Sequence, residues 1–562
     1  MRHIVEQLAL HGLIKDDDIE GLMSELQRRG DSLHKILRQK PELDAEQLAH
    51  FWMSLTSWDR LPSNEGVQVH LPYIDLFGVE FSRLHGCIVL EQGSEIVFAG
   101  LHPFSVSICD DISLRLACKL KKCIIFEKDF NRFLEQNFSF TAEDRDLPQL
   151  DEQSIEKIQR EISKSDDLLD MANKAPVVRL INGILFQALQ QRSSDIHLQP
   201  YEDHFIVRYR IDGMLKDAIT LPKSIQEAVC SRIKVMGKMD IAERRLPQDG
   251  TTSFLAAGRE VDVRISSLPS IYGERLVLRL QDKSGGVKKL EDIGLSAKSL
   301  IDIQQLLKMS HGMILVTGPT GAGKTTTLYA MLDRLNEPDV NIITLEDPVE
   351  LVLPGISQIQ VAHKKGLTFA TGLRSIVRQD PDVIMVGEIR DLETARISIQ
   401  SALTGHLVLS TLHTNDAVSA ITRLVDLGVE PTLINASVLG VIAQRLVRTV
   451  CAHCKTNIKY SDSDLQQWDM ERSDFAGVSF VMGRGCSHCN QSGYYGRTAL
   501  YEILLLDQVF KAELHKESSY QHLFQVSVGR GMSTLRADGI QKIKAGLTTP
   551  EEVFRVTQLN GF

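Results

Sequence analysis

Apolar and polar residues follow two kinds of pattern in the second half of the chain. From about residue 300 onward, short runs of consecutive apolar residues alternate with longer segments whose apolar residues recur at helical spacing. The runs predict buried strands, and the segments between them predict amphipathic helices. Because strands joined by helices favour a parallel sheet, we expect a parallel α/β core. The expected strands are 314–317, 342–345, 383–386 and 407–410.

The pattern changes several times before this core. Residues 1–62 have a helical pattern with a weak internal duplication, and strand-like runs follow at 88–90 and 96–99. Residues 139–175 are rich in charge, which is typical of a linker with one solvated helix. A helix at 177–191 and four strands are expected next, so the chain should divide into parts 1–138, 139–175, 176–295 and 296–562. The four strands are 196–199, 205–211, 261–265 and 275–280.

Composition limits the classes of protein to consider. The chain has 562 residues, 43% hydrophobic and 24% charged, which is typical of a globular protein of three or four domains. A net charge of −10 gives no electrostatic footprint for nucleic acid, so no nucleic-acid partner is expected. No apolar run reaches the roughly 18 residues that span a bilayer, and residues 1–6 lack the apolar centre of a signal peptide. We expect a cytoplasmic protein that reaches the membrane only through partners.

A glycine-rich segment follows the first strand of the predicted core. It reads Gly-Pro-Thr-Gly-Ala-Gly-Lys-Thr over 318–325, between an apolar strand and the start of a helix. In such a loop, backbone N–H groups and the helix N-terminus bind phosphate oxygens. Lys324 should reach the β- and γ-phosphates, and Thr325 should offer its hydroxyl to Mg²⁺. A glycine-rich turn without a ligand is the alternative, but the strand–loop–helix context favours phosphate binding. The candidate binding residues are Gly318, Pro319, Thr320, Gly321, Ala322, Gly323, Lys324, Thr325 and Thr326.

Acidic and histidine side chains follow the later strands of the core. Glu346 and Asp347 follow one strand, Glu388 the next, and His413 a third. Ligands of open parallel sheets lie beyond the carboxyl ends of the strands, so these side chains should gather opposite Lys324. Phosphoryl transfer needs a carboxylate that holds Mg²⁺ and another that orients or deprotonates water.

These candidates divide into three roles. Glu388 suits the metal, directly or through water, and Glu346 suits the attacking water, with Asp347 beside it. His406 or His413 is a candidate sensor of the γ-phosphate. For any single residue, a solvated acid at a strand end or a structural histidine is the alternative. Three such clusters downstream of one phosphate loop favour catalysis.

Four segments together resemble the secretion ATPases, the hexameric motors of type II secretion and type IV pilus assembly. They are the phosphate loop, the acidic segment 345–350, the segment 378–391 and the segment 404–415, which match the family's Walker A motif, Asp box, Walker B motif and His box. Upstream matches at 194–197, 208–213, 244–250 and 273–275 extend the resemblance over about 175–562. It implies a RecA-like P-loop NTPase core, a PAS-like α/β domain before it, and hydrolysis of ATP with Mg²⁺.

The resemblance also implies that arginines of the 176–295 domain complete the site. Arg259, Arg264 and Arg275 are the candidates for contacting phosphates of their own or a neighbouring subunit. A bidentate guanidinium suits developing phosphoryl charge. The alternative is that they are strand-surface arginines paired with Glu260 or Asp262.

Cysteines form a second candidate site. Five of the nine are scattered among apolar residues and are expected to be buried, whereas the other four form two C-x-x-C pairs. Two such pairs can close a four-sulfur tetrahedral zinc site, which would be structural because no coordination position stays open. A redox pair is the alternative, but two matched copies argue against it. The expected ligands are Cys451, Cys454, Cys486 and Cys489, within an element at 449–500.

The tetracysteine pattern is typical of the assembly members of the family rather than the retraction motors. Segments 175–182, 419–424 and 443–448 resemble the type II secretion branch, so we expect a motor for pseudopilus assembly, with a pilus extension motor as the alternative. A nucleic-acid translocase would need a basic, aromatic channel, and a non-hydrolysing scaffold would have lost Glu346 or Glu388.

The resemblance implies several partners. They are five further copies in a hexamer, an inner-membrane platform protein and a membrane-anchored docking protein. The N-terminal domain is similar to a degenerate cyclic-di-GMP-binding domain. Where relatives carry Arg-Leu-Gly, this chain has His3-Ile4-Val5 and Ser32-Leu33-His34. Cyclic-di-GMP binding is therefore not expected.

Overall fold

The computed structural model describes two compact units of the chain. The first comprises Met1–Gln187, Leu198–Ile206 and Ile219–Gln281, and the second comprises Ala188–His197, Val207–Ala218 and Asp282–Phe562. Most of the predicted linker 139–175 lies outside the described residues. These are 2–11, 13–15, 18–29, 33, 37, 45–56, 58–61, 67–70, 73, 77, 81–82, 85–92, 95–103, 106–116, 118–130, 133, 175–256, 259–282, 286–475 and 477–558.

The first unit begins with helices and a small mixed sheet. Helix α6 (Val106–Arg115) packs Cys109 and Ile112 against the sheet, whose strand order is β1-β5-β4-β3-β2. The strands expected at 88–90 and 96–99 are confirmed as the antiparallel neighbours β3 and β4. The other elements are α1 (Arg2–Leu10), α2 (Ile19–Arg29), α4 (Ala45–Leu55), β1 (Asp59–Arg60), β2 (Val67–Val69), β3 (Cys87–Gln92), β4 (Glu95–Gly100) and β5 (Lys121–Ile124).

A six-stranded sheet with the order β8-β7-β6-β11-β10-β9 follows. All four strands that the sequence predicts in this region are present, as are the predicted helix and two further strands, β8 and β9. The pattern did not reveal β8 because most of its residues are partly or fully exposed. The elements are α10 (Ala175–Gln190), β6 (Ser193–Pro200), β7 (His204–Ile211), β8 (Met214–Pro222), α11 (Gln226–Met236), β9 (Gln248–Ala256), β10 (Arg259–Ser270) and β11 (Gly273–Asp282).

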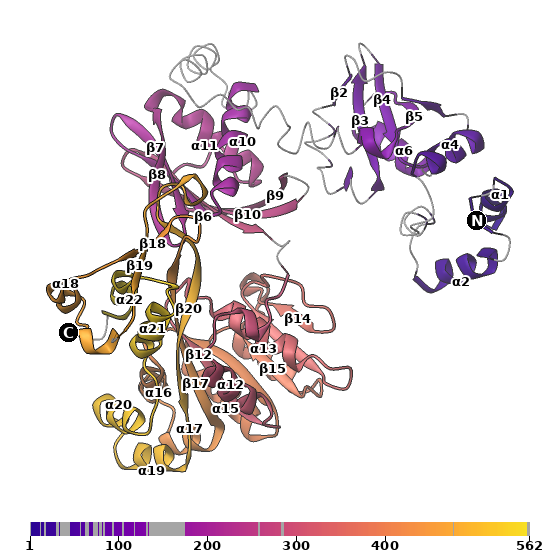
Figure 1. The fold of residues 1–562 in the computed structure, drawn as a ribbon. Helices are drawn as coiled ribbons and strands as arrows, with labels where there is room; N and C mark the ends of the chain where they lie inside the picture. The colour runs from indigo at the N-terminus through magenta and orange to yellow at the C-terminus, as the bar shows by residue number, and fades with distance from the viewer. Residues whose placement is uncertain are drawn as a thin grey trace. The chain divides into compact units, whose positions relative to one another are not determined.

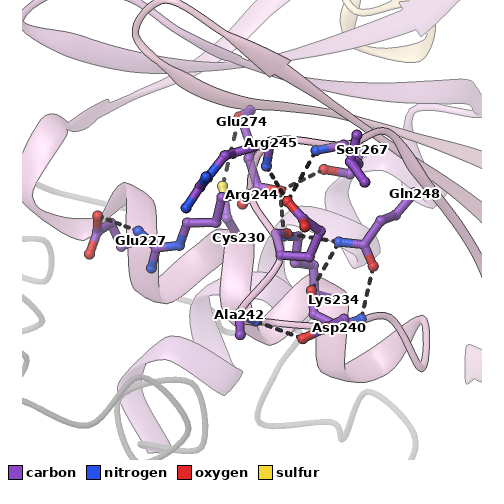
Figure 2. A network of polar contacts seen from close by, with 12 residues as sticks. Glu227, Cys230, Lys234, Asp240, Ala242, Arg244, Arg245, Gln248, Ser267 and Glu274 are labelled. Carbon is purple, nitrogen blue, oxygen red and sulfur yellow. Dashed lines mark hydrogen bonds and ion pairs between the residues drawn. The ribbon is translucent and has the colours of Figure 1, made fainter.

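A buried ion pair ties α11 to this sheet (Figure 2). Lys234, of which 1% is exposed, pairs with the carboxylate of Glu274 and donates to the carbonyl of Glu243 at 2.7 Å. Ser267 Oγ donates to Glu274 Oε1 at 2.9 Å, and Gln248 Nε2 donates to the same Glu243 carbonyl at 2.9 Å. A charge removed from water needs such partners, and together they fix the irregular segment between α11 and β9.

The second unit is built on a seven-stranded sheet with the order β14-β13-β15-β16-β12-β17-β20. Its strands run parallel except that β20 is antiparallel to β17. The four strands predicted from apolar runs form the contiguous centre of the sheet. The strands are β12 (Gly312–Thr317), β13 (Ile342–Glu346), β14 (Ser357–Gln360), β15 (Val383–Val386), β16 (Leu407–Leu412), β17 (Val438–Val450) and β20 (Tyr494–Leu505).

Helices cover both faces of this sheet (Figure 1), which explains the continuous apolar run in β12. Met313 and Leu315 pack in the core with α15 (Leu392–Leu403) and α16 (Ala417–Asp426). Ile314 and Val316 point to the other face and pack with α12 (Ala297–Leu307) and α13 (Lys324–Leu335). Alternate residues of β12 therefore pack into two different hydrophobic cores, one on each face of the sheet.

The remaining elements lie between strands of this sheet or after its last strand, β20. Strands β18 and β19 pair as a small two-stranded antiparallel sheet. Among the described residues, no helix is long and apolar enough to cross a membrane. The elements are α14 (Phe369–Ile376), α17 (Pro431–Ser437), β18 (Lys455–Ile458), α18 (Asp462–Gln467), β19 (Phe480–Gly483), α19 (Gln508–Lys516), α20 (Tyr520–Gly529), α21 (Leu535–Lys544) and α22 (Pro550–Thr557).

Candidate functional site

The phosphate loop connects β12 to α13, as the sequence predicts. Gly318 has a φ of 150°, and a Cβ there would lie 2.4 Å from the carbonyl oxygen of Gln444. Gly323, at the N-cap of α13, has a φ of 87°. A side chain at Gly318 would collide with the neighbouring strand β17, so the loop depends on glycine where it passes that strand.

Lys324 lies at the start of α13 with its ammonium turned back into the loop. It donates to the carbonyl oxygens of Gly318 at 2.8 Å and Pro319 at 3.2 Å. Burial lowers the pKa of Lys324 to about 8, although the carboxylate of Glu388 opposes the change. The loop therefore holds a cation whose charge favours an anionic partner.

Glu388, on the turn after β15, lies beside this ammonium with a side chain that is 13% exposed. Its Oε2 atom is 2.6 Å from Nε of Arg390 and 3.4 Å from Nε2 of His413. Burial lowers the pKa of His413, and Lys324 adds to this, whereas Glu388 opposes it. The carboxyl ends of β12, β15 and β16 thus bring together a lysine, a carboxylate and a histidine whose pKa favours the neutral form.

Glu346 is the last residue of β13 and is 4% exposed. Its Oε2 accepts from the hydroxyl of Tyr329 at 2.5 Å. Its Oε1 accepts from Thr344 Oγ1 at 2.6 Å and from Gln358 Nε2 at 3.1 Å. Because β13 lies next to β15, this network is adjacent to the turn that carries Glu388. Three donors from α13, β13 and β14 therefore fix the carboxylate.

Asp347 lies beside these groups, but His406 does not. Asp347 Oδ2 is 3.2 Å from Nε2 of His363. The hydrogen bond and charge of Glu388 raise the pKa of Arg390, and the charge of Asp347 adds to this. His406 precedes β16, whereas His413 follows it, and β16 runs parallel to β12. Six strand residues separate the two histidines by roughly 20 Å. The structure therefore does not bring His406 to the phosphate loop of its own chain.

A cavity of about 250 Å³ opens beside the phosphate loop and reveals residues that sequence reasoning missed. Three arginines line it together with loop residues 319–322, namely Arg445 on β17, Arg497 on β20 and Arg555 on α22. Arg445 is 6% exposed, and its Nη2 donates to Asn415 Oδ1 at 2.7 Å. From the sequence alone, the segment 443–448 indicates only a resemblance to the type II secretion branch of the family. A guanidinium within an apolar strand was the available signal.

Comparison with known proteins identifies the family of this chain. The sequence profile of the family described as "Type II/IV secretion system protein" matches residues 170–555. The chain belongs to this family. Like other members, this secretion ATPase is an ATP-hydrolysing enzyme with an α/β core.

Relatives of this secretion ATPase match most of its length. Type II secretion system protein HxcR of Pseudomonas aeruginosa is 49% identical over 407 residues, which are 72% of this chain and 83% of HxcR. Type II secretion system protein E of Dickeya dadantii is 50% identical, and type II secretion system ATPase E of Vibrio cholerae is 46% identical. Each comparison spans 398 residues, 71% of this chain and 79% or 78% of the relative. The fold is similar to that of the Legionella pneumophila ATPase DotB, with a TM-score of 0.51 and 21% identity over 68% of this chain and 96% of DotB.

The three arginines predicted to complete the site belong to the first unit of the secretion ATPase, whereas the phosphate loop belongs to the second. Arg264 lies on β10 and is partly buried, Arg275 lies on β11 and is exposed, and the side chain of Arg259 lies outside the described part of the chain. Their contact with a nucleotide stays a prediction.

The four predicted cysteine ligands of the secretion ATPase come together. All their Sγ atoms lie within 4.8 Å of one another. Three of the Sγ–Sγ separations are 3.9 Å for Cys451–Cys486, 3.8 Å for Cys454–Cys489 and 3.7 Å for Cys486–Cys489. Four thiolates that bind one zinc ion tetrahedrally at 2.3 Å lie about 3.8 Å apart. The residues present therefore fit zinc.

The scattered cysteines are mostly buried, as expected. Cys87, Cys109, Cys123 and Cys230 are buried, whereas Cys118 is partly exposed. Ser32 and His34, two of the positions compared with the cyclic-di-GMP motif, lie outside the described residues.

Proposed function

We propose that this ATPase is the motor that powers pseudopilus assembly in type II protein secretion. The observation that carries the proposal is the grouping of Lys324, Glu388 and His413 at the phosphate loop. It occurs in a chain whose reported relatives, at 46–50% identity, are all named as type II secretion proteins. The residues grouped at the phosphate loop and the names of the relatives both support an ATP-driven motor of type II secretion.

Each residue has a proposed role in hydrolysis. Lys324 binds the β- and γ-phosphates, the Thr325 hydroxyl binds Mg²⁺, and Glu388 holds Mg²⁺ from the other side. Glu346 orients the attacking water, and the donors Tyr329, Thr344 and Gln358 keep its carboxylate in place. His413 is the proposed sensor of the γ-phosphate, because its Nε2 lies 3.4 Å from Glu388 Oε2 and because burial, with Lys324 adding to it, lowers its pKa and favours the neutral ring.

The positive lining of the cavity beside the loop supports binding of the rest of the nucleotide there. Arg445, Arg497 and Arg555 supply guanidinium groups, and Leu446 and Val556 supply apolar surface. A group of guanidinium side chains beside an anion-binding loop suits a polyphosphate. Arg259, Arg264 and Arg275 are proposed to contribute from the domain at 176–295, within one subunit or across a subunit boundary.

We further propose a hexamer that acts at the cytoplasmic side of the inner membrane through a platform protein and a membrane-anchored docking protein. The four parts 1–138, 139–175, 176–295 and 296–562 remain our proposed domain boundaries. Zinc at the four cysteines would supply a structural cross-link between two chain segments. Cyclic-di-GMP and nucleic acid are not proposed as ligands.

Secretion in living cells tests the motor function. A strain that lacks this protein is complemented with the wild-type gene or with Lys324→Ala, and both exported enzymes in the medium and surface pili are measured. We expect the variant to lose export while pili persist. Loss of pili with normal export would instead identify a pilus extension motor.

A further inference from the structure

Between the second cysteine pair and the phosphate loop lies a connected set of side chains, all in the second unit. Cys486 and Cys489 flank a short turn that carries His488. The ring of His488 stacks on Tyr495, with centroids 4.1 Å apart and an interplanar angle of 26°. The guanidinium of Arg192 lies over the face of the same Tyr495 ring, 3.5 Å from its centroid. The metal-binding turn is therefore linked to Arg192 through one aromatic ring.

Arg192 continues this link to Asp212. Its Nη2 lies 3.6 Å from Asp212 Oδ2, and the backbone N–H of Gly496 donates to the same oxygen at 3.1 Å. Arg497 Nε lies 3.9 Å from Asp212 Oδ1. Only 13% of the Asp212 side chain is exposed, so the carboxylate depends on these neighbours.

Asp212 and Gly213 form the turn between β7 and β8. Both have positive φ, 48° and 87°, as a two-residue hairpin turn requires. This turn lines the cavity of about 250 Å³ together with phosphate-loop residues 319–322. Asp212 also lines a second cavity, of about 210 Å³, together with Arg192, His488 and Cys489. The turn is thus shared by the cysteine element and the nucleotide cavity.

Non-glycine residues with positive φ are concentrated around Arg192, Asp212 and the turn after Cys489. Seven described residues other than glycine have positive φ, and four of them, Arg192, Asp212, Asn490 and Gln491, line this linkage or belong to the turn after Cys489. Asp and Asn adopt positive φ readily, so Asp212 and Asn490 fit their turns, whereas Arg192 and Gln491 hold this conformation at an energetic cost that their surroundings must offset. Contacts at both ends therefore constrain the linkage.

We propose that Arg192 is a positioning residue that couples metal occupancy of the tetracysteine site to nucleotide affinity. With the cysteine turn held in place, His488 and Tyr495 fix Arg192, and Arg192 fixes the Asp212-Gly213 turn at the rim of the phosphate-loop cavity. Without that restraint the turn moves, and nucleotide binds more weakly although the phosphate loop is unchanged. This inference rests on the zinc proposed at the four cysteines.

A double-mutant cycle on the full-length chain tests the coupling. The wild type, Cys454→Ser, Arg192→Gln and the double variant are compared for zinc content, by elemental analysis, and for the Kd of a fluorescent N-methylanthraniloyl ATP. Each single variant should weaken nucleotide binding about five-fold. Because both substitutions interrupt the same chain of contacts, the double variant should also bind about five-fold more weakly than the wild type, rather than about 25-fold. Arg179→Gln, an exposed arginine on α10, should bind as the wild type does.

Two ring variants protect the test against simple misfolding. Tyr495→Phe keeps the aromatic face and should bind nucleotide as the wild type does, whereas Tyr495→Leu should match Arg192→Gln. Unchanged affinity in metal-free Cys454→Ser, or additive losses near 25-fold, would overturn the coupling. A wild-type chain without zinc would also overturn it, and saturable binding of the fluorescent nucleotide in the same sample would show that the ATP site itself stands.

Discussion

The ammonium of Lys324 is bonded to the carbonyl oxygen of Gly318, 2.8 Å away within the loop that its own helix follows. Burial lowers the pKa of this lysine to about 8. Phosphate oxygens at the same place would favour the charged form and raise the pKa again. Nucleotide binding and protonation of Lys324 are therefore linked.

This linkage predicts proton uptake on binding at alkaline pH. Because the pKa of Lys324 is lowered to about 8, this lysine is mostly neutral at pH 8.5 in the free protein. Nucleotide binding should therefore be accompanied by uptake of roughly three-quarters of a proton at pH 8.5, and by almost none from this lysine at pH 6.5. Affinity should fall as the pH rises through about 8. Calorimetry in two buffers of different ionisation enthalpy measures the uptake. Lys324→Arg should abolish it, and uptake that persists in this variant would assign the proton elsewhere.

Removal of the carboxylate of Glu346 should stop turnover without loss of binding. Because this side chain orients the attacking water in our proposal, Glu346→Gln should lower kcat by roughly 10²- to 10⁴-fold and change nucleotide Kd little. Tyr329→Phe removes one of its three donors and should have a smaller effect. Phosphate release measures the turnover of both variants, with the exposed Glu337→Gln as control. Normal turnover in Glu346→Gln would refute the assignment.

The buried pair in Figure 2 makes a prediction about stability. Lys234→Met leaves Glu274 charged and buried, and should cost about 3–5 kcal/mol of unfolding free energy. Lys234→Met combined with Glu274→Leu removes both charges and should recover most of that loss. Calorimetric unfolding of the full chain provides the measurement, with the exposed Lys288→Met as control. A double variant no more stable than the single one would contradict this account.

Glu552 should make the C-terminal helices sensitive to acid. Burial alone would raise its pKa, but hydrogen bonds and ion pairs from Arg448 and Arg555 outweigh it and lower the pKa to about 2. A depressed acid pKa stabilises the fold above the usual value near 4.5, and this stability is lost as the pH falls toward 2. Glu552→Gln should lower stability at pH 7 and flatten its decline in acid, whereas the exposed neighbour Glu551→Gln should change neither. Thermal melts from pH 7 to pH 3 would show the difference.

The tetracysteine site predicts one zinc ion per chain. Elemental analysis of purified protein should find this ratio, and Cys454→Ser should lose the metal because three thiolates remain. Cys118→Ser changes a partly exposed cysteine outside the cluster and should keep it. Zinc retained in Cys454→Ser would show that the ion lies elsewhere.

Much of the central fold was predictable because its signals are local. Strands buried on both faces are continuous apolar runs, and those of β12, β13, β15 and β16 were located from the sequence. Strand β8, with its largely exposed residues, and β14, short and only partly buried, carry no such run and were missed. Helix α10 was found within one or two residues of its bounds.

The candidate site was only partly predictable for the same reason. The phosphate loop and the cysteine pairs are defined by spacing within a few residues, so the sequence located both. His406 and His413 look equivalent along the chain, but strand polarity separates them, and only His413 reaches Glu388.

The sequence by itself determined the phosphate loop, the four ligand cysteines and the central strands, because each depends on neighbouring residues and on backbone geometry that short spacing encodes. Only the tertiary structure decided that Arg445 and Arg497 join the phosphate-loop cavity and that Arg192 connects Tyr495 with Asp212. Those contacts join segments that lie far apart in the chain, and they are set by strand order and register, which local hydrophobic patterns do not specify.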